Sequence, residues 1–439
     1  MTKTPWGKAD ELRSRRLPPG PGQPRKEASA NQRERLLAAT VSVVAEKGYE
    51  PMRVADLVAV SGVSRSAFYK HFENKQDCFL ATLDAITTLA VPTLFERARA
   101  ASGDWSERLA AMLETLFTLV AAQPAAARVV WVEGYAAGPE AVRHIEQFDV
   151  QVEDFVLELT SESPEHAGLP RDVVRAVCGG LRKMVNTRIR EGREKELFAL
   201  IPDLVTWALS YHTPRDRLRR PRKPPTGLID PPPAPVDARE RILAAVTDIV
   251  AEGGYPTMKI TEIARRAAVS LTTFYDDFDG KQDAFVAAIE RGLQRTYEAP
   301  VPAFQAAGDW PHAVAWALHA FFAVFSFDPG LGHLGGVGAY EGGRPAMESR
   351  DESIMAYYGF LDGGLEIAPG TPAIVPEAIG ASIYALMTHQ VRHRGAHRLY
   401  EIAPTAAFMA LAPYIGSDEA IAVANERPQV PPRESSPTA

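Results

Sequence analysis

The sequence is poor in cysteine and lacks the long, uninterrupted apolar runs that cross a membrane. Its 439 residues include only two cysteines, Cys78 and Cys178, whose contexts exclude a disulfide framework and a thiolate metal site. The longest apolar stretch, Ala315–Phe327, is too short and too interrupted to span a bilayer, and there is no signal-peptide pattern. We therefore expect a cytoplasmic protein that does not bind a membrane.

Signals for β-strands and for catalysis are also missing. Apolar residues recur at helical spacing, as in Leu36, Leu37, Val41 and Val44, and hairpin signals are absent. The predicted fold class is all-α. The chain has no Ser/His/Asp order, phosphate-binding loop or convincing metal cluster, so we expect no catalytic residue, no cofactor and no metal. The sequence does not predict an enzyme.

Two patterns resemble known sites but fit them poorly. The run Gly330–Gly335 has the spacing G-x-G-x-x-G, but a dinucleotide site needs a preceding strand and a following helix, so we interpret it as a glycine-rich loop. His389, His393 and His397 are spaced to share a helical face as metal ligands, but Gly395 interrupts that helix and arginines crowd it. A polar helix face is the better interpretation.

The chain as a whole has fewer basic than acidic residues, but some of its segments are rich in basic residues. The formal net charge is −7, which argues weakly against a nucleic-acid partner. Residues 1–30 nonetheless hold seven basic residues against three acidic ones, and residues 211–236 hold six against two. Basic segments beside a compact domain are typical of phosphate contact, although solubilising disordered tails have the same composition.

The chain contains an internal repeat. Residues 33–80 align without a gap with residues 239–286, and 21 of these 48 positions are identical. Weaker matches continue further on, such as Gly-Asp-Trp at 103–105 and again at 308–310. Both halves are therefore expected to share one fold.

In each strong repeat, the residues that end and begin helices are spaced as in a helix-turn-helix. In the first copy a helix of about fourteen residues ends at Gly48, a short helix covers 54–60, and a tight turn leads to Ser64. Ser64 is a good N-cap for the next short helix, over 65–72, and Ser270 has the same place in the second copy. The second helix of such a pair enters the major groove by its N-terminal end.

These residues resemble the signature of the TetR family of transcriptional regulators. The family pattern is Gly-Val-Ser, then a Phe/Leu-Tyr pair, a Phe and a Lys. It matches GVSRSAFYKHFENK at 62–75 and AVSLTTFYDDFDGK at 268–281. The resemblance covers about 48 residues in each copy and is only architectural elsewhere. It implies two TetR-like units in tandem, each with a three-helix DNA-binding domain and a helical domain for ligand binding and dimerisation.

The repeat and the resemblance together predict seven segments. They are a disordered basic arm (1–30), a first helix-turn-helix domain (31–80), a first helical effector and interface domain (81–213), a Pro-rich basic linker (214–236), a second helix-turn-helix domain (237–286), a second helical effector and interface domain (287–416) and a disordered tail (417–439). We refer to 31–80 as the first head and to 237–286 as the second head.

The resemblance also implies which residues face DNA. Tyr69 and Tyr275 are expected on the exposed face of each recognition helix, Lys75 and Lys281 are expected to contact phosphate, and the phenylalanines are expected in the core. Arg53 stands where the family often has a capping Thr, which weakens the cap but leaves a cation near the phosphates. The candidate DNA-binding residues are Arg53, Ser64, Arg65, Ser66, Tyr69, Lys70, His71, Lys75, Lys259, Ser270, Leu271, Thr272, Thr273, Tyr275 and Lys281.

The two copies differ where bases would be read. The first presents Arg65, and arginine is the commonest reader of guanine edges, whereas the second presents Leu271 with Asp276 and Asp277. Residues 31–75 hold seven basic and five acidic residues, and residues 237–281 hold six and eight. We predict unequal half-sites, or a weak second reader that depends on Arg265, Arg266, Thr272 and the linker. A third interpretation is that the second motif has lost DNA contact.

The leading hypothesis is a ligand-responsive repressor that acts as a single-chain pseudo-dimer on double-stranded DNA with a non-palindromic operator. In the family, the last two helices of each subunit form a four-helix interface, which implies Asp172–Tyr211 and Pro376–Tyr414 here. A small apolar effector is implied, in a cavity lined by some of the aromatics of the two bodies, among them Phe321, Phe325, Tyr357 and Tyr358.

Two alternatives stay open. In one, only the first helix-turn-helix binds DNA and the chain forms a homodimer with a second chain. In the other, the protein is a small-molecule carrier or an enzyme whose helix-turn-helix units are vestigial.

Overall fold

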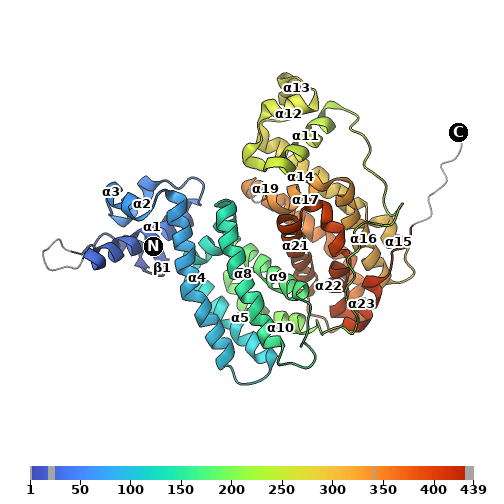
Figure 1. The fold of residues 1–439 in the computed structure, drawn as a ribbon, viewed down its shortest axis with the longest axis horizontal. Helices are drawn as coiled ribbons and strands as arrows, with labels where there is room; N and C mark the ends of the chain where they lie inside the picture. The colour runs from blue at the N-terminus through green and yellow to red at the C-terminus, as the bar shows by residue number, and fades with distance from the viewer. Residues whose placement is uncertain (1, 18–24, 340–341, 431–439) are drawn as a thin grey trace. The chain divides into compact units, whose positions relative to one another are not determined.

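The computed structural model describes residues 2–17, 25–339 and 342–430, and it is helical almost throughout (Figure 1). The all-α class is confirmed. The elements of the first copy are β1 (Lys3–Thr4), β2 (Gly7–Lys8), η1 (Ala9–Glu11), α1 (Arg25–Lys47), α2 (Val54–Ser61), α3 (Arg65–His71), α4 (Lys75–Ala100), α5 (Trp105–Ala122), α6 (Pro124–Arg128), η2 (Val129–Glu133), α7 (Gly134–Ala136), α8 (Pro139–Thr160), α9 (Arg171–Arg190), η3 (Glu194–Leu200) and α10 (Ile201–Leu209).

The second copy repeats the order of the main helices and has further short segments. Its elements are α11 (Ala238–Gly253), η4 (Tyr255–Thr257), α12 (Ile260–Ala267), α13 (Leu271–Asp277), α14 (Lys281–Glu298), α15 (Val301–Gln305), α16 (Trp310–Phe327), α17 (Pro329–His333), η5 (Leu334–Gly338), α19 (Gly343–Ala356), η6 (Tyr357–Leu361), α20 (Asp362–Ile367), α21 (Val375–Arg394), η7 (Ala396–Ile402), α22 (Ala403–Ile415) and α23 (Ser417–Asn425).

The repeat continues through the effector domains in detail. Helix α5 has the same length as α16, and each is capped at its N-terminus by an aspartate, Asp104 or Asp309, whose carboxylate accepts backbone N–H groups. A five-residue helix and a π-helical segment follow in both copies, η2 in the first and η5 in the second. Because π-helical segments are rare, their recurrence at the same place supports one fold for both halves.

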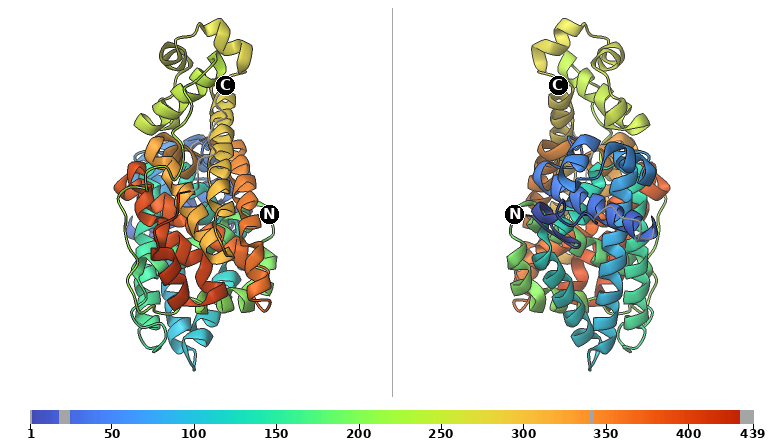
Figure 2. Two further views of the ribbon diagram at one scale, coloured as in Figure 1. Left: turned by 90° about the vertical axis from the view of Figure 1, so that its right-hand side faces the viewer. Right: turned by 90° about the vertical axis from the view of Figure 1, so that its left-hand side faces the viewer.

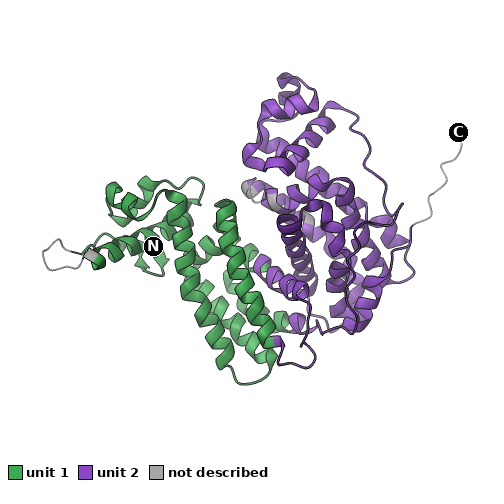
Figure 3. Cartoon of the chain, viewed as in Figure 1, with its two compact units in different colours: residues 1–159, 184–205 green, residues 160–183, 206–439 purple. Residues whose placement is uncertain are grey.

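The chain separates into two compact units, and their division does not follow the repeat (Figure 3). Unit 1 comprises residues 1–159 and 184–205, and unit 2 comprises 160–183 and 206–439. The N-terminal part of α9 and the end of α10 belong to the first copy in sequence but cluster with the second. Two glycines of α9 allow this packing, since a Cβ on Gly179 would lie 2.5 Å from Ala385 Cβ, and one on Gly180 would lie 2.3 Å from Ser382 Oγ.

The arm predicted as disordered is ordered over its described part. Residues 2–17 form the β1–β2 pair and η1, and Leu12 is fully buried within unit 1. The Arg13 guanidinium donates to the Ala59 carbonyl at the C-terminal end of α2 (Nε–O 2.9 Å), where the helix dipole favours a cation. Residues 25–30 begin α1, and residues 18–24 lie outside the described residues. The prediction failed because it used composition, whereas burial of Leu12 depends on tertiary contact.

The linker and the tail also differ from expectation. The linker has no helix or strand between residues 214 and 236, as predicted, but its arginines are engaged within unit 2: Arg215 pairs with Asp418, and Arg220 with Asp172. The tail predicted as disordered from residue 417 instead forms α23, and its residues 431–439 lie outside the described residues. Asn425 of α23 accepts the Arg219 N–H (2.8 Å) and donates to the Arg217 carbonyl (3.0 Å).

Two further expectations need correction. By length and composition alone, α4 and α16 are long and apolar enough to cross a membrane, so the exclusion drawn from Ala315–Phe327 does not hold on those criteria. In the structure α16 supplies core residues such as Phe322, which is fully buried. The run Gly330–Gly335 is helical, not a loop. Its glycines let helices approach closely, because a Cβ on Gly332 would lie 2.7 Å from a Leu399 methyl group.

Candidate DNA-reading heads and effector cavity

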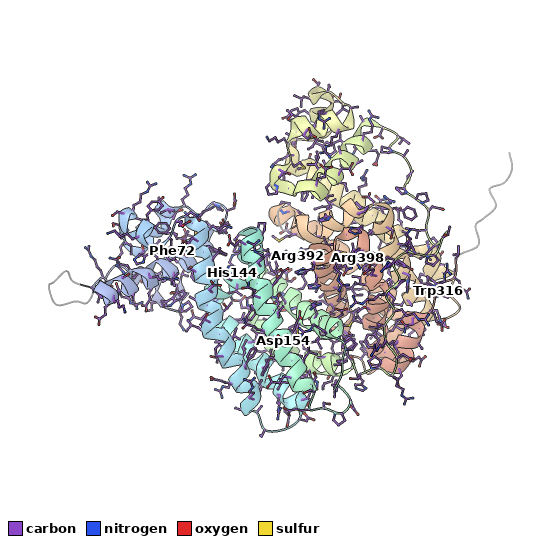
Figure 4. All side chains as sticks on the ribbon, in the orientation of Figure 1. Phe72, His144, Asp154, Trp316, Arg392 and Arg398 are labelled. Carbon is purple, nitrogen blue, oxygen red and sulfur yellow. The ribbon has the colours of Figure 1, made fainter. Side chains whose placement is uncertain are left out.

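The first head presents α3 on a local framework that the sequence specifies. The predicted N-cap is confirmed: Ser64 Oγ accepts the backbone N–H of Ala67 (3.2 Å). Phe68 is fully buried and packs against Phe72, with ring centroids 5.8 Å apart; Phe72 is labelled in Figure 4. These two anchors fix one face of α3 against the head and leave the opposite face outward.

The outward face of α3 carries most of the predicted readers. Arg65, Ser66, Tyr69 and Lys70 are exposed, and the Arg65 guanidinium carbon lies 5.9 Å from the centre of the Tyr69 ring. This contact orients the planar guanidinium group of Arg65, a hydrogen-bond donor, along the surface of α3. His71 is set back, because its Nε2 lies 3.2 Å from Gln32 Oε1 and burial lowers its pKa. The structure therefore groups four of the predicted readers and separates His71 from them.

The N-terminus of α2 and the side chain of Lys75 both make contacts within the first head. The Arg53 N–H donates to Asp56 Oδ2 (2.8 Å), which is the half of a capping box that an acidic residue in the first turn supplies, and the Arg53 side chain stays exposed. Lys75 Nζ donates to the Glu50 carbonyl (2.8 Å) and lies 4.6 Å from the Tyr49 ring centre. These contacts hold the ammonium group inside the head, so its predicted phosphate contact stays a prediction.

The second head has the same framework. Ser270 Oγ accepts the Thr273 N–H (3.0 Å), Phe274 is fully buried, and Lys281 lies 4.4 Å from the Tyr255 ring centre. Helix α14 leads from this head into the effector helices (Figure 2). The exposed face of α13 carries Leu271, Thr272, Tyr275, Asp276 and Asp277, whereas Thr273 is half-buried. Lys259 is exposed at the start of α12.

The arginines on which a weak second reader would depend already have partners. Arg265 and Arg266 both donate to Glu262, and Arg266 also donates to Glu252 (2.6 Å). The two arginines hold the pKa of Glu262 at about 2, so its carboxylate is ionised at neutral pH. Exposed ion pairs are worth at most about 1 kcal/mol, so phosphates could compete for these arginines. The exposed aspartates of α13 are the stronger obstacle to DNA.

The effector domain of the second copy encloses a cavity of about 130 Å³. Side chains from α14, α16, α19, η6 and α21 line it, and they are mostly apolar. Four of the aromatics named from the sequence are among them, Phe321, Phe325, Tyr357 and Tyr358. Sequence reasoning missed Arg350, which also lines the cavity, because an arginine in a polar helix gives no signal of burial.

Comparison with known proteins identifies the heads. The sequence profile of a family described as bacterial regulatory proteins, tetR family, matches residues 36–82 and 242–288. Both heads belong to the TetR family, and the chain carries two of them in tandem. The two matched segments are the two heads, with α1–α3 in the first and α11–α13 in the second.

Individual TetR-family relatives match parts of the chain. FasR of Mycolicibacterium smegmatis, an HTH-type transcriptional activator, is 25% identical over 150 residues, which are 34% of this chain and 67% of FasR. CymR of Pseudomonas putida, an HTH-type transcriptional regulator, is 44% identical over 50 residues, 11% of this chain and 25% of CymR. The crystal structure of FadR from Bacillus subtilis, in complex with stearoyl-CoA, is 22% identical with a TM-score of 0.37, covering 40% of this chain and 97% of FadR.

The three histidines considered as metal ligands do not converge. His389 and His393 lie in α21, with ring centroids 4.3 Å apart, but α21 ends before Gly395 and His397 falls in η7. Burial and nearby arginines lower the pKa of His389 to about 3, which describes a neutral ring on a packed helix. Among residues 2–17, 25–339 and 342–430, no group of three His, Cys, Asp or Glu side chains could hold a metal ion.

Ala268 in the second TetR-family head occupies a strained backbone position. Its φ is +53°, in the left-handed region, where the first head has Gly62 with φ +65°. We expect Ala268→Gly to stabilise the second head by up to about 1 kcal/mol. The left-handed conformation costs a residue with a Cβ about 1–2 kcal/mol, which glycine avoids. Glycine also gives the unfolded chain more conformational entropy, and this offsets part of the gain. Hydrogen exchange of α12 and α13 measures this. Gly62→Ala is the reciprocal variant and should destabilise the first head; faster exchange in Ala268→Gly would contradict the prediction.

We expect His319 to make the second effector domain less stable in acid. It is buried in α16, its Nδ1 lies 2.8 Å from the Tyr400 hydroxyl, and burial lowers its pKa to about 4. Below pH 6.5 the unfolded chain gains a proton that the folded ring does not, so stability falls as pH drops toward 4. The expected loss from this group between pH 7 and pH 5.5 is about 1 kcal/mol. Urea unfolding at both pH values measures the loss, and His319→Gln should reduce it; an unchanged pH dependence in the variant would exclude His319 as the cause.

Proposed function

We propose that the chain is a ligand-responsive transcriptional regulator that acts as a single-chain pseudo-dimer with two non-identical reading heads. The observation that carries the proposal is the pair of recognition helices, α3 and α13, which share a framework but present different residues. The first exposes Arg65 and Lys70, and the second exposes Leu271 and Asp276. A homodimer has the same residues in both heads, whereas a fused repeat can read two unlike half-sites with a single chain.

Contacts within unit 2 support the pseudo-dimer. Helix α9, from the first copy, meets α21 of the second at Gly180, where the two backbones approach closely. The Tyr211 hydroxyl of the first copy donates to the Met409 carbonyl of α22 (3.0 Å) and is fully buried. These are the segments that family resemblance assigns to the interface between two subunits.

The second effector cavity supports a response to a small molecule. Its lining is suited to an apolar group, as effector pockets usually are. Ligand binding would reduce or increase DNA affinity through linkage between the cavity and the heads. The sign of regulation stays a prediction: we expected a repressor, while FasR is described as an activator.

One observation favours a second candidate, in which only the first head binds DNA and two chains pair. Arg265 and Arg266 are engaged with acidic partners, and Asp276 and Asp277 face outward from α13. In that case the second head would not contribute to the operator.

Genomic footprinting of the occupied DNA, followed by gel-shift stoichiometry, separates the candidates. The proposal requires one chain per operator and protection of two half-sites about 34–36 Å apart. Two chains per operator would favour the second candidate. Absence of salt-dependent duplex binding at occupied sites would favour a carrier or an enzyme with vestigial heads.

A further inference from the structure

The cavity in the second effector domain has an unexpected charged residue in its wall. Its volume of about 130 Å³ is similar to that of engineered apolar cavities of roughly 150 Å³ that bind benzene, so it has room for an apolar group of about six carbons. Arg350 is the single charged side chain among the described lining residues, and it is 1% exposed. An apolar ligand alone would gain nothing from a guanidinium at this place.

Arg350 is held in place by α19 and α21. Its Nη1 donates to the Tyr384 hydroxyl (3.0 Å), and its Nε and Nη2 both donate to Asp351 Oδ1 (2.9 and 2.7 Å). The guanidinium carbon lies 4.9 Å from the Tyr384 ring centre. The Tyr384 hydroxyl in turn donates to the Gly336 carbonyl in the π-helical segment η5 (3.0 Å). Arg350 is therefore oriented at the cavity wall by partners on both sides.

The partner of Arg350 is shared with a second cation. Lys183 of α9 donates to the same atom, Asp351 Oδ1, at 2.6 Å, and both side chains are largely buried. A buried carboxylate that loses its counter-ion is strongly destabilised, so a ligand that drew Arg350 away would normally strand Asp351. Because Lys183 remains, Arg350 can exchange Asp351 for another anion without leaving a buried charge unpaired.

We propose that this cavity binds a small amphipathic anion, with an apolar body of about six carbons and a carboxylate or phosphate end that pairs with Arg350. Guanidinium groups bind both kinds of anion through paired N–H donors. The inference rests on the proposed ligand-responsive function and specifies its effector class. It applies to the second copy, because Ile145 stands 205 residues before Arg350, at the offset that relates α5 to α16.

Calorimetric titration of the full chain tests the proposal with matched pairs of probes. The anions are hexanoate, benzoate and hexyl phosphate, and the neutral partners are 1-hexanol and benzyl alcohol. At least one anion should bind the wild-type protein ten or more times tighter than its neutral partner. Preference for hexanoate over hexyl phosphate, or the reverse, identifies the end group.

Two variants locate the preference. Arg350→Met should abolish it while alcohol affinity stays within about twofold, and a thermal unfolding curve checks that the variant folds. Arg398→Met is the matched control, because Arg398 pairs with Glu401 and does not line the cavity. It should keep the wild-type preference.

The outcomes separate the inference from the function on which it rests. If alcohols bind wild type as tightly as anions, or if Arg350→Met keeps the preference, the anion proposal is wrong but ligand binding stands. If neither class of probe binds, the amphipathic-anion proposal is overturned. The proposed function fails separately, if no occupied DNA site is found. The comparison of anions with alcohols uses only the wild-type protein. It therefore still tests the proposal if the Arg350→Met protein does not fold.

Discussion

Arg65→Ala is expected to weaken operator binding by about 1–3 kcal/mol, a loss of roughly five- to 150-fold in affinity. Arg65 is exposed at the N-terminal turn of α3, the part of a recognition helix that contacts base edges. Arginine binds the O6 and N7 atoms of guanine through two donors, and alanine supplies neither. Fluorescence anisotropy with the footprinted duplex measures the loss.

The location of that loss tests the asymmetry of the heads. Base substitutions in each half-site should show that Arg65→Ala affects one half only. Leu271→Ala, at the same position of α13, is the matched control and should change affinity little. The dependence on salt should stay nearly constant if Arg65 reads a base, because loss of a phosphate contact would lower the slope. Equal effects on both halves would contradict unlike reading heads.

Gly180→Leu is expected to destabilise the protein by about 3 kcal/mol. A Cβ at this position would lie 2.3 Å from Ser382 Oγ and 3.2 Å from the Ala378 carbonyl oxygen, and the backbone atom cannot move aside without shifting α21. Overpacking a well-packed contact typically costs 1–3 kcal/mol, and leucine adds three more carbons than alanine. Urea denaturation, with the transition of unit 2 followed separately, measures the change.

A second glycine provides the control for this packing effect. Gly370 has open space around it and no left-handed backbone, so Gly370→Leu should change stability by less than about 0.5 kcal/mol. If the α9–α21 contact also holds the two copies together for DNA binding, Gly180→Leu should lower operator affinity at temperatures where the protein stays folded. A Gly180→Leu protein as stable as Gly370→Leu would show that α9 and α21 do not pack this closely.

The framework of each head could be predicted from the sequence because residues close together in the chain determine it. Ser64 and Ser270 each accept the backbone N–H three residues on, and Phe68 and Phe274 follow at fixed spacing, so the sequence pattern and the structure coincide. The framework is short-range, and both copies have it. The exposed face of α3 then follows from helical geometry.

The other features depend on contacts between distant segments, which local pattern cannot supply. Leu12 is buried only because residues 2–17 fold back on the first head, and Lys75 turns inward only because Tyr49 lies beneath it. The charge pairing of Arg266 with Glu252 spans the turn between two helices. Arg350 reads as a surface residue in sequence, and its place in the cavity wall appears only when α19 packs against α21.

The linker joins the two copies covalently, and this changes how operator occupancy depends on protein concentration. Arg219 and Arg217 bind Asn425 of α23 on opposite sides of one amide, so part of the segment that joins the copies is held against the second copy. Two separate subunits must first associate. In dilute solution the concentration of their dimer falls with the square of the subunit concentration. Covalently joined copies face each other at an effective concentration in the millimolar range. In the proposed pseudo-dimer, operator occupancy at low protein concentration would therefore rise in simple proportion to the number of chains.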